Sequence, residues 1–176
     1  MRVFLDFEAS SLGKKGYPIE VGWVWEDGRA EGHLIRPAPE WQDWDERAAA
    51  IHHLTRERLA AEGEPHDAVA RRMIEQLTGH DLLASAPSWD GKWLSTLLRA
   101  AGRPRHALRL RDTEAAWAEA VADALGRHAD ARPIIAAARA DAATWPVAHR
   151  AVDDAERERR LWLSIRTRAQ SEAARG

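Results

Sequence analysis

The segment that most constrains the fold lies at the N-terminus, where an apolar strand pattern carries two acidic residues. The run Val3-Phe4-Leu5-Asp6-Phe7-Glu8 has the period-two alternation of a β-strand. Further strands are predicted from Ile19 to Glu26 and from Glu31 to Ile35. Asp27-Gly28 between them is a strong hairpin signal, because both residues tolerate the positive φ angles of a tight turn. An antiparallel unit of three strands is therefore expected at the start of the chain.

After Pro37 and Pro39, helical periodicity alternates with short apolar runs. Short helical pieces are predicted around 45–59, longer helices at 65–77, 89–101, 113–125, 133–143 and after 149, and strands at 81–86 and 108–110. A hairpin followed by alternating strands and helices implies an α/β fold, with a five-stranded mixed sheet flanked by helices. The 176 residues show no internal repeat or linker, so a single domain over 1–176 is expected.

Composition limits the functional classes. Cysteine is absent, which excludes disulfides and thiolate metal sites. No apolar run approaches the ~20 residues that span a bilayer, and no signal segment is recognisable, so a cytoplasmic location is the default expectation. The formal charge of −2 argues against tight, non-specific duplex binding through a large basic face. Two bound divalent cations would make the protein net positive, so a phosphate-rich substrate stays compatible with the sequence.

Asp6 and Glu8 are two residues apart on the predicted first strand, so their side chains leave the same face. Their backbone origins are then about 6.6 Å apart, which suits two ligands of cations that lie about 3.5–4 Å from each other. The alternative is a strand with a polar outer face. A buried acid without a partner costs several kcal/mol, and no lysine or arginine is an obvious partner in the sequence. A bound cation is therefore the favoured interpretation.

Asp90 follows the predicted strand 81–86 at the start of a helix. Two interpretations are open at this point. A carboxylate there can cap the helix N-terminus. It can also lie at the carboxyl end of a strand, where ligands usually bind in open α/β sheets.

The segment from His149 to Ala155 supplies the remaining candidates. With Ala151 and Ala155 on the buried side of a helix that turns about 100° per residue, Asp154 lies about 60° from Ala151 and Asp153 about 200° from it. Asp154 therefore borders the packed side and is preferred over Asp153. His149 is placed in the loop that enters the helix. It is either a surface histidine or a group that accepts a proton from water.

Together these residues resemble the DEDD superfamily of 3'–5' exonucleases, in its histidine-bearing (DEDDh) branch, which includes oligoribonuclease, ribonuclease T and proofreading domains. The matching segments are Leu5-Asp6-Phe7-Glu8-Ala9-Ser10, Ile19-Glu20-Val21-Gly22, Ile51-His52-His53-Leu54-Thr55, Trp89-Asp90 with Trp93-Leu94, Asp112-Thr113, and His149-x-Ala151-x-x-Asp154-Ala155. Their order and spacing cover the chain from Val3 to about Ala155. Ser85-Ala86-Pro87 stands where the family often has His-Asn-Ala, and His53 replaces a frequent glycine.

The resemblance implies a ribonuclease H-like fold and a metal-dependent 3'–5' exonuclease. The enzyme would release nucleoside 5'-monophosphates from single-stranded RNA or DNA by a two-metal-ion mechanism. It implies Asp6, Glu8, Asp90 and Asp154 as ligands of two Mg²⁺ or Mn²⁺ ions, and His149 as the general base. Ala9, Ser10 and Leu12 would line the pocket of the terminal nucleotide, and Trp89 is a further candidate for contact with a base. Some relatives are dimers, so a homodimer is expected by analogy.

Two other classes are considered: a catalytically silent nucleic-acid-binding module on the same fold, and a metal-dependent phosphatase acting on nucleotides. Trp41 and Trp44, in a Pro-flanked stretch, are interpreted as a lid or partner surface. The arginines between Arg150 and Gly176 either attract a nucleic-acid backbone or form a solvated helix face with intrahelical pairs.

Overall fold

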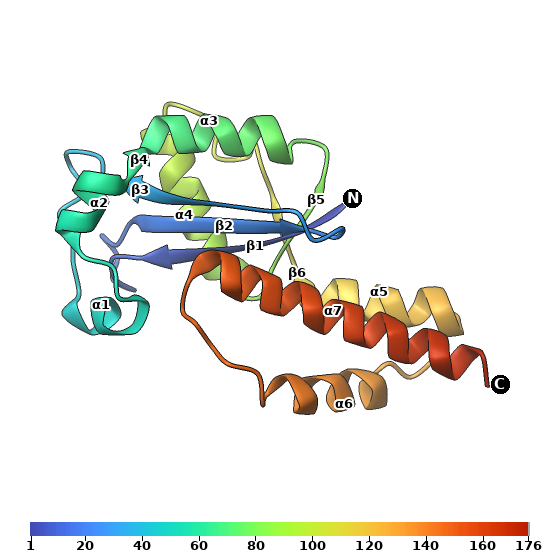
Figure 1. Ribbon diagram of the computed structural model, residues 1–176. Helices are drawn as coiled ribbons and strands as arrows, with labels where there is room; N and C mark the ends of the chain where they lie inside the picture. Colours follow the sequence, from blue (N-terminus) through green and yellow to red (C-terminus); the bar gives the residue numbers. More distant parts are fainter. Residues whose placement is uncertain (176) are drawn as a thin grey trace.

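The computed structural model describes residues 1–175 and contains a six-stranded mixed sheet flanked by helices (Figure 1). The strands are β1 (Arg2–Ala9), β2 (Pro18–Trp25), β3 (Ala30–Arg36), β4 (Glu64–Pro65), β5 (Asp81–Ala84) and β6 (Leu110–Asp112). Their order across the sheet is β4-β3-β2-β1-β5-β6, so β1 is a central strand. It pairs antiparallel with β2 and parallel with β5. The α/β class and the mixed sheet predicted from the sequence are confirmed.

The prediction of five strands was wrong by one, because β4 has only two residues. It pairs parallel with the end of β3, where Ile35 lies opposite Glu64 and Arg36 opposite Pro65. Two residues cannot show a period-two pattern. Pro65 also looks like a helix start in the sequence, although proline is tolerated on an edge strand where its missing N–H faces away from the ladder.

The helices are α1 (Glu46–His52), α2 (Arg56–Glu62), α3 (His66–Leu77), α4 (Pro87–Ala100), α5 (Thr113–Leu125), α6 (Arg132–Ala142) and α7 (Ala151–Ala173). Val3, Leu5 and Phe7 belong to the core that packs against α3 and α4. Phe4 points to the other face and belongs to the core shared with α5, α6 and α7. Figure 1 shows α5 and α7 side by side on that face, and α1 and α2 near the end of β1.

Two boundaries differ from the prediction in ways that matter for the site. α4 begins at Pro87 rather than Trp89, because proline suits the first position of a helix, where no N–H donor is required. β6 spans Leu110–Asp112 rather than 108–110, since its pairing with β5 sets Leu110 against Leu82 and Asp112 against Ala84.

Trp41 and Trp44 are partly buried and pack against the fold, so core packing accounts for part of each ring, and their interpretation as a lid or partner surface stays a prediction. The Trp41 ring stacks on Tyr17 at a centroid distance of 5.3 Å, and Trp44 packs edge-on against His52 at 6.1 Å. Both tryptophans contact a small core cluster that includes Tyr17 and Leu54. Their irregular backbone left no periodicity from which this packing could be predicted. Within residues 1–175, no helix has the length and apolar character required to cross a membrane.

Candidate active site

The first strand presents two carboxylates toward α7. Along β1, Leu5 and Phe7 are buried against α3 and α4, while Asp6 and Glu8 are partly exposed on the opposite face. The ladder with β2 sets Asp6 opposite Gly22 and Glu8 opposite Glu20. The alternation read from the sequence therefore fixes both acids on the face where the last helix packs.

A pair of glycines allows the N-terminus of α7 to come close to that face. Gly22 and Gly32 lie opposite each other on β2 and β3. A Cβ atom on Gly22 would lie 2.3 Å from the backbone nitrogen of Val152, and one on Gly32 would lie 2.3 Å from Val152 Cγ2. At Gly22 the clash is with the helix backbone, so a side chain there would require α7 to move, whereas at Gly32 the Val152 side chain would have to move. Because Gly22 is the ladder partner of Asp6, this contact sets α7 directly beside the carboxylate.

A buried ion pair holds the same end of α7. Glu20 is 5% exposed and accepts hydrogen bonds from the Arg150 guanidinium, the shortest being 2.6 Å from Nη2 to Oε1. Glu20 Oε2 also accepts from the backbone N–H of Ala151 at 3.2 Å. A carboxylate that accepts the first N–H groups of a helix stabilises its positive end. Arg150 and Glu20 are 130 residues apart in the sequence, so the pair connects the start of α7 to β2.

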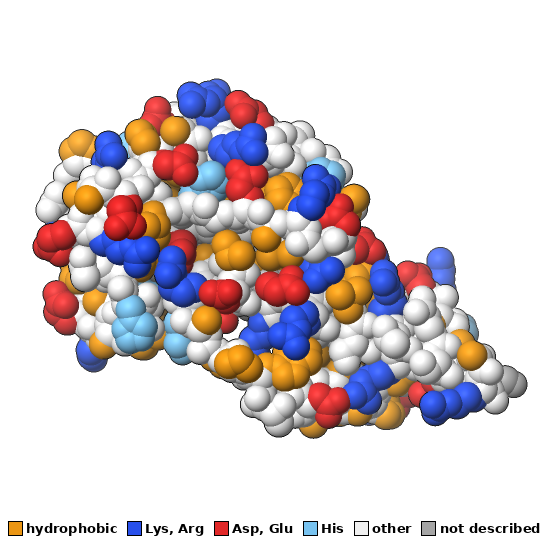
Figure 2. All heavy atoms as spheres, in the orientation of Figure 1, with side chains coloured by type: hydrophobic (Ala, Val, Ile, Leu, Met, Phe, Trp, Pro, Cys, Tyr) orange, Lys and Arg blue, Asp and Glu red, His pale blue; other side chains and the backbone are white. Residues whose placement is uncertain are grey.

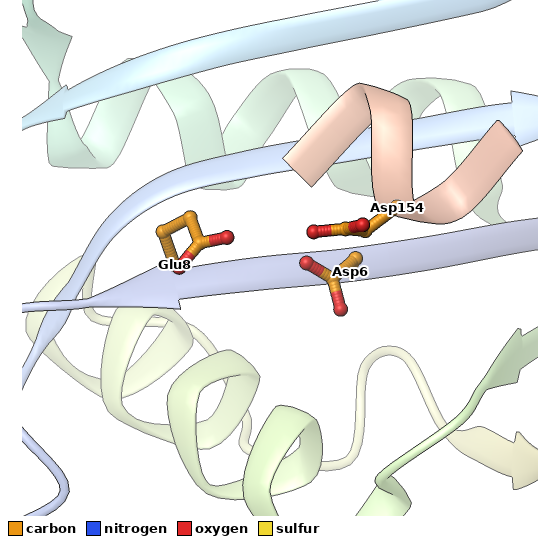
Figure 3. Close-up of side chains that lie close together, drawn as sticks. All are labelled: Asp6, Glu8 and Asp154. Carbon is orange, nitrogen blue, oxygen red and sulfur yellow. The ribbon is translucent and has the colours of Figure 1, made fainter. Parts of the chain in front are cut away.

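The result is a cluster of three carboxylates. Asp6, Glu8 and Asp154 each offer an oxygen atom, and these atoms lie within 4.8 Å of one another. Figure 3 shows Asp6 and Glu8 on β1 and Asp154 on α7, with the three carboxylates close together. Ala151 and Ala155 are fully buried and Asp153 is exposed, so the helix faces lie as the 100° periodicity predicted.

Asp90 lies apart from this group of three but borders the same space. The capping interpretation of Asp90 was wrong: the N-cap position of α4 is Ala86, and Asp90 lies one turn inside the helix. Asp90 is 4% exposed, and its Oδ2 atom has no hydrogen-bond partner in the described chain. A buried carboxylate oxygen without a donor is costly unless a cation or a proton neutralises it.

The electrostatics of the cluster reflect crowding of like charges. Burial, followed by the charge of Asp90, raises the pKa of Asp6 well above its usual range. Burial and the neighbouring Asp154 raise the pKa of Glu8 to about 7. Burial likewise raises the pKa of Asp90 to about 7. Burial raises the pKa of Asp154, opposed by the charges of His149 and Arg157. Without a bound cation, Glu8 and Asp90 are therefore partly protonated near neutral pH.

Glu158 is a fifth acid that sequence reasoning missed. Its Oε2 atom is buried without a hydrogen-bond partner among residues 1–175, and burial raises its pKa. Its charge also raises the pKa of Asp6 and of Asp90. The available signal was the spacing of four residues from Asp154, which sets both side chains on one face of the helix.

His149 lies outside α7, in the segment that connects it to α6. Its φ of 52° is in the left-handed region, which is uncommon for a residue other than glycine. The side chain is exposed and borders a cavity of about 310 Å³ that Asp6, Glu8, Asp154 and Glu158 also line. The structure therefore brings the predicted imidazole to the same cavity as the carboxylates.

A larger cavity of about 610 Å³ opens on the other side of Asp6 and Glu8. Three predicted substrate-contacting residues line it: Ala9, Leu12 and Trp89. Leu12 is 68% exposed and Trp89 42% exposed, so both present apolar surface to an incoming molecule. Ser10 does not line the cavity. It is fully buried, and its Oγ accepts a hydrogen bond from the backbone N–H of Tyr17.

The cavity is also lined by residues that the predicted substrate contacts did not include, among them Ser11, Ile51 and His52. Ser11 Oγ donates to the carboxylate of Asp43 and accepts from the backbone N–H of Gly13, so it orders the loop that carries Leu12. His52 is 2% exposed, and its Nδ1 accepts from the N–H of Leu54. The motif around Ile51 and His52 was a signal for this position.

The donor set fits divalent cations with a preference for oxygen ligands. All the acids concerned are carboxylates, which is the chemistry of Mg²⁺ and Mn²⁺ sites rather than of zinc–thiolate sites. Among residues 1–175, no lysine or arginine forms an ion pair with Asp6, Glu8, Asp90 or Asp154. Asp90 Oδ2, which has no hydrogen-bond partner in the described chain, adds a buried acceptor beside Asp6, Glu8 and Asp154. These residues therefore match a metal site in charge and in ligand type.

The fold is a ribonuclease H-like nuclease fold, as comparison with solved structures shows. E. coli exonuclease I in complex with a dA16 oligonucleotide is similar to 98% of this chain, with a TM-score of 0.70 and 16% sequence identity. The zinc-bound form of the E. coli ExoI–ssDNA complex is similar to 95% of it, with a TM-score of 0.69 and 16% identity. This chain covers 42% and 40% of those chains, which is less than half of their length. No protein-family model matches the sequence, and no curated protein does.

Proposed function

We propose that this chain is a metal-dependent 3'–5' exonuclease of the DEDD superfamily, in its histidine branch. It would hydrolyse terminal phosphodiester bonds of single-stranded nucleic acid and release nucleoside 5'-monophosphates. The observation that carries the proposal is the group of Asp6, Glu8 and Asp154 within 4.8 Å of one another, in no ion pair with a lysine or arginine of the described chain, beside a cavity with exposed apolar residues. The similar exonuclease I structures contain single-stranded oligonucleotides, which supports this substrate class.

Asp6, Glu8, Asp90 and Asp154 would hold two Mg²⁺ or Mn²⁺ ions. When bound, such ions increase the acidity of water and stabilise the charge that develops on phosphate and leaving oxygens. The carboxylates would hold this charge at the edge of the cavity that they line. Their own contribution would be electrostatic, because they gather negative charge between β1 and the first turns of α7, where cations would be held.

His149 would act as the general base. It is exposed, lies in the segment between α6 and α7, and borders the cavity that Asp154 lines. A neutral imidazole accepts a proton from the attacking water as the oxygen forms its bond to phosphorus. The proton leaves the reacting centre on the histidine, while the bond from phosphorus to the 3' oxygen breaks.

The cavity of about 610 Å³ would receive the terminal nucleotide. Its exposed apolar residues Leu12, Ile51 and Trp89 offer surfaces for a base. Base stacking on aromatic side chains contributes about 1–3 kcal/mol per base and tolerates any sequence. Such a pocket suits an enzyme that removes successive nucleotides of different identity.

The test is digestion of a 5'-labelled oligonucleotide, as RNA and as DNA, single-stranded and duplex, with Mg²⁺ or Mn²⁺. A ladder of shortening products is expected for single strands, and the variant Asp154→Asn should lose it. Asp153→Asn is the matched control, because Asp153 is the exposed neighbour on the same helix. Free nucleotides assayed in parallel distinguish an exonuclease from a nucleotide phosphatase. A phosphatase would release phosphate from the free nucleotides and leave the oligonucleotide intact. Wild-type digestion by Asp154→Asn would disprove the proposed site.

A further inference from the structure

We propose that the exposed face of α4 and the segment that follows it form a track for the phosphate backbone of single-stranded nucleic acid. This inference rests on the proposed function and extends it from the terminal nucleotide to the nucleotides upstream. The track starts at Trp89 beside the cavity and continues through Lys92 and Arg99 to Arg103, Arg105 and Arg109.

The helix geometry sets the first part of the track. At about 100° per residue, Trp89, Lys92 and Arg99 lie within about 80° of one another around the axis of α4. Asp90 and Leu97 point to the buried side. The rise of about 1.5 Å per residue sets Arg99 roughly 15 Å from Trp89 along the helix. A ligand that leaves the cavity over Trp89 would therefore meet the two cationic side chains in succession.

The charge of this region has one sign. Residues 87–110 contain Lys92 and four arginines but only one acid, Asp90, which is buried. The four arginines Arg99, Arg103, Arg105 and Arg109 are exposed. None of them forms an ion pair with an acid in the part of the chain that the structure describes. A run of free cations on a chain of net charge −2 is complementary to a polyanion.

The arginines of α7 contrast with this track. Arg150 pairs with Glu20, Arg159 with Glu156, Arg166 with Glu26, and Arg168 with Asp141. Glu20, Glu26 and Asp141 lie outside α7, so most of these pairs are not intrahelical. This differs from the intrahelical pairs that the sequence suggested. Figure 2 shows basic and acidic side chains interspersed on the face of the molecule that carries α7. The charges of these four arginines are therefore compensated within the protein.

Lys92 connects the cavity to the track. Its ammonium lies over the rings of Trp93 and Trp89, 4.1 Å and 5.3 Å from their centroids. It also donates a hydrogen bond of 2.6 Å to the backbone oxygen of Gly13, next to Leu12. The positive charge is thus held where a strand would leave the pocket, with donors left for a phosphate.

The experiment compares binding and digestion of single-stranded DNA of three and twelve nucleotides. Binding is measured by fluorescence anisotropy in EDTA, and digestion with Mn²⁺. The test variant is R99E/R103E. The matched control is R127E/R175E, which makes the same charge change at two exposed arginines without ion pairs in the described residues. R99K/R103K keeps the charge and should restore binding, because lysine also attracts phosphate.

Wild-type protein is expected to bind the 12-mer more tightly than the 3-mer, and R99E/R103E should reduce this preference. Loss of two phosphate contacts should reduce the slope of log affinity against log salt concentration by about 1.4. Raising the salt from 50 to 200 mM would then weaken binding of the variant roughly sevenfold less than binding of the wild type. Equal effects of R99E/R103E and the control would overturn the track. Digestion that does not depend on length would reject the track and still support the exonuclease. Length-dependent binding without digestion would support the track and reject the exonuclease.

Discussion

Replacing Asp90 with asparagine should stabilise the metal-free protein, although it removes a residue proposed to hold metal. Asp90 is 4% exposed, and its Oδ2 atom has no partner in the described structure. Burial raises its pKa to about 7 from an ordinary value of 3.8. Asparagine has nearly the same shape and carries no charge, so it avoids the cost of an ionised carboxylate in this position.

The magnitude follows from the linkage between protonation and folding. A carboxyl group with a folded pKa of about 7 keeps its proton where the unfolded chain has already released it, so its presence lowers stability as pH rises from 3.8 toward 7. At about 1.4 kcal/mol per pKa unit, the ionised group costs roughly 4 kcal/mol at pH 8 and under about 2 kcal/mol at pH 5. Asp90→Asn should recover most of this difference.

The assay is urea unfolding in EDTA at pH 5 and pH 8, for the wild type, Asp90→Asn and Asp153→Asn. The stability gain of Asp90→Asn should be larger at pH 8 than at pH 5 by about 2–3 kcal/mol. Asp153 is exposed and outside the cluster, so its variant should match the wild type at both pH values. A gain for Asp90→Asn that does not change with pH, or a loss of stability at pH 8, would refute the assignment of Asp90 to a buried environment that disfavours its ionised form.

Three further outcomes are expected. Gly22→Ala should destabilise the protein by about 1–3 kcal/mol in urea unfolding, because its Cβ would lie 2.3 Å from the nitrogen of Val152; Gly91→Ala, with nothing within 4 Å, should instead gain about 0.5–1 kcal/mol. His149→Ala should reduce kcat about 10²–10⁴-fold in the oligonucleotide assay without moving the urea midpoint, because the side chain is exposed. In calorimetry at pH 8, Mg²⁺ or Mn²⁺ at 100 times its Kd should stabilise the wild type by about 2.7 kcal/mol, reversibly with EDTA, and this gain should be lost in Asp154→Asn; an equal gain in that variant would contradict its role as a ligand.

The homodimer expected by analogy stays a prediction, which analytical ultracentrifugation at several protein concentrations would test. A single sedimenting species at the monomer mass would contradict it.

Local periodicity was sufficient for several features of the candidate site. The alternation in Val3–Glu8 set Asp6 and Glu8 on one face of a strand, and the structure has them there. The 100° turn per residue separated Asp154 from Asp153 in the last helix, and the Asp154 side chain is the one that reaches the cluster. These features depend only on neighbours within one element, so the sequence alone contains them.

Contacts between distant elements were decided only in three dimensions. The approach of Val152 to Gly22 and the ion pair of Arg150 with Glu20 join segments about 130 residues apart. No periodic pattern reports which strand a helix will pack on, or how closely. The same holds for Glu158, which enters the acidic cluster only because α7 lies across β1. Sequence determined which faces carry the acids, whereas packing of the sheet and helices decided which acids meet, because distances between elements depend on the whole core rather than on any one segment.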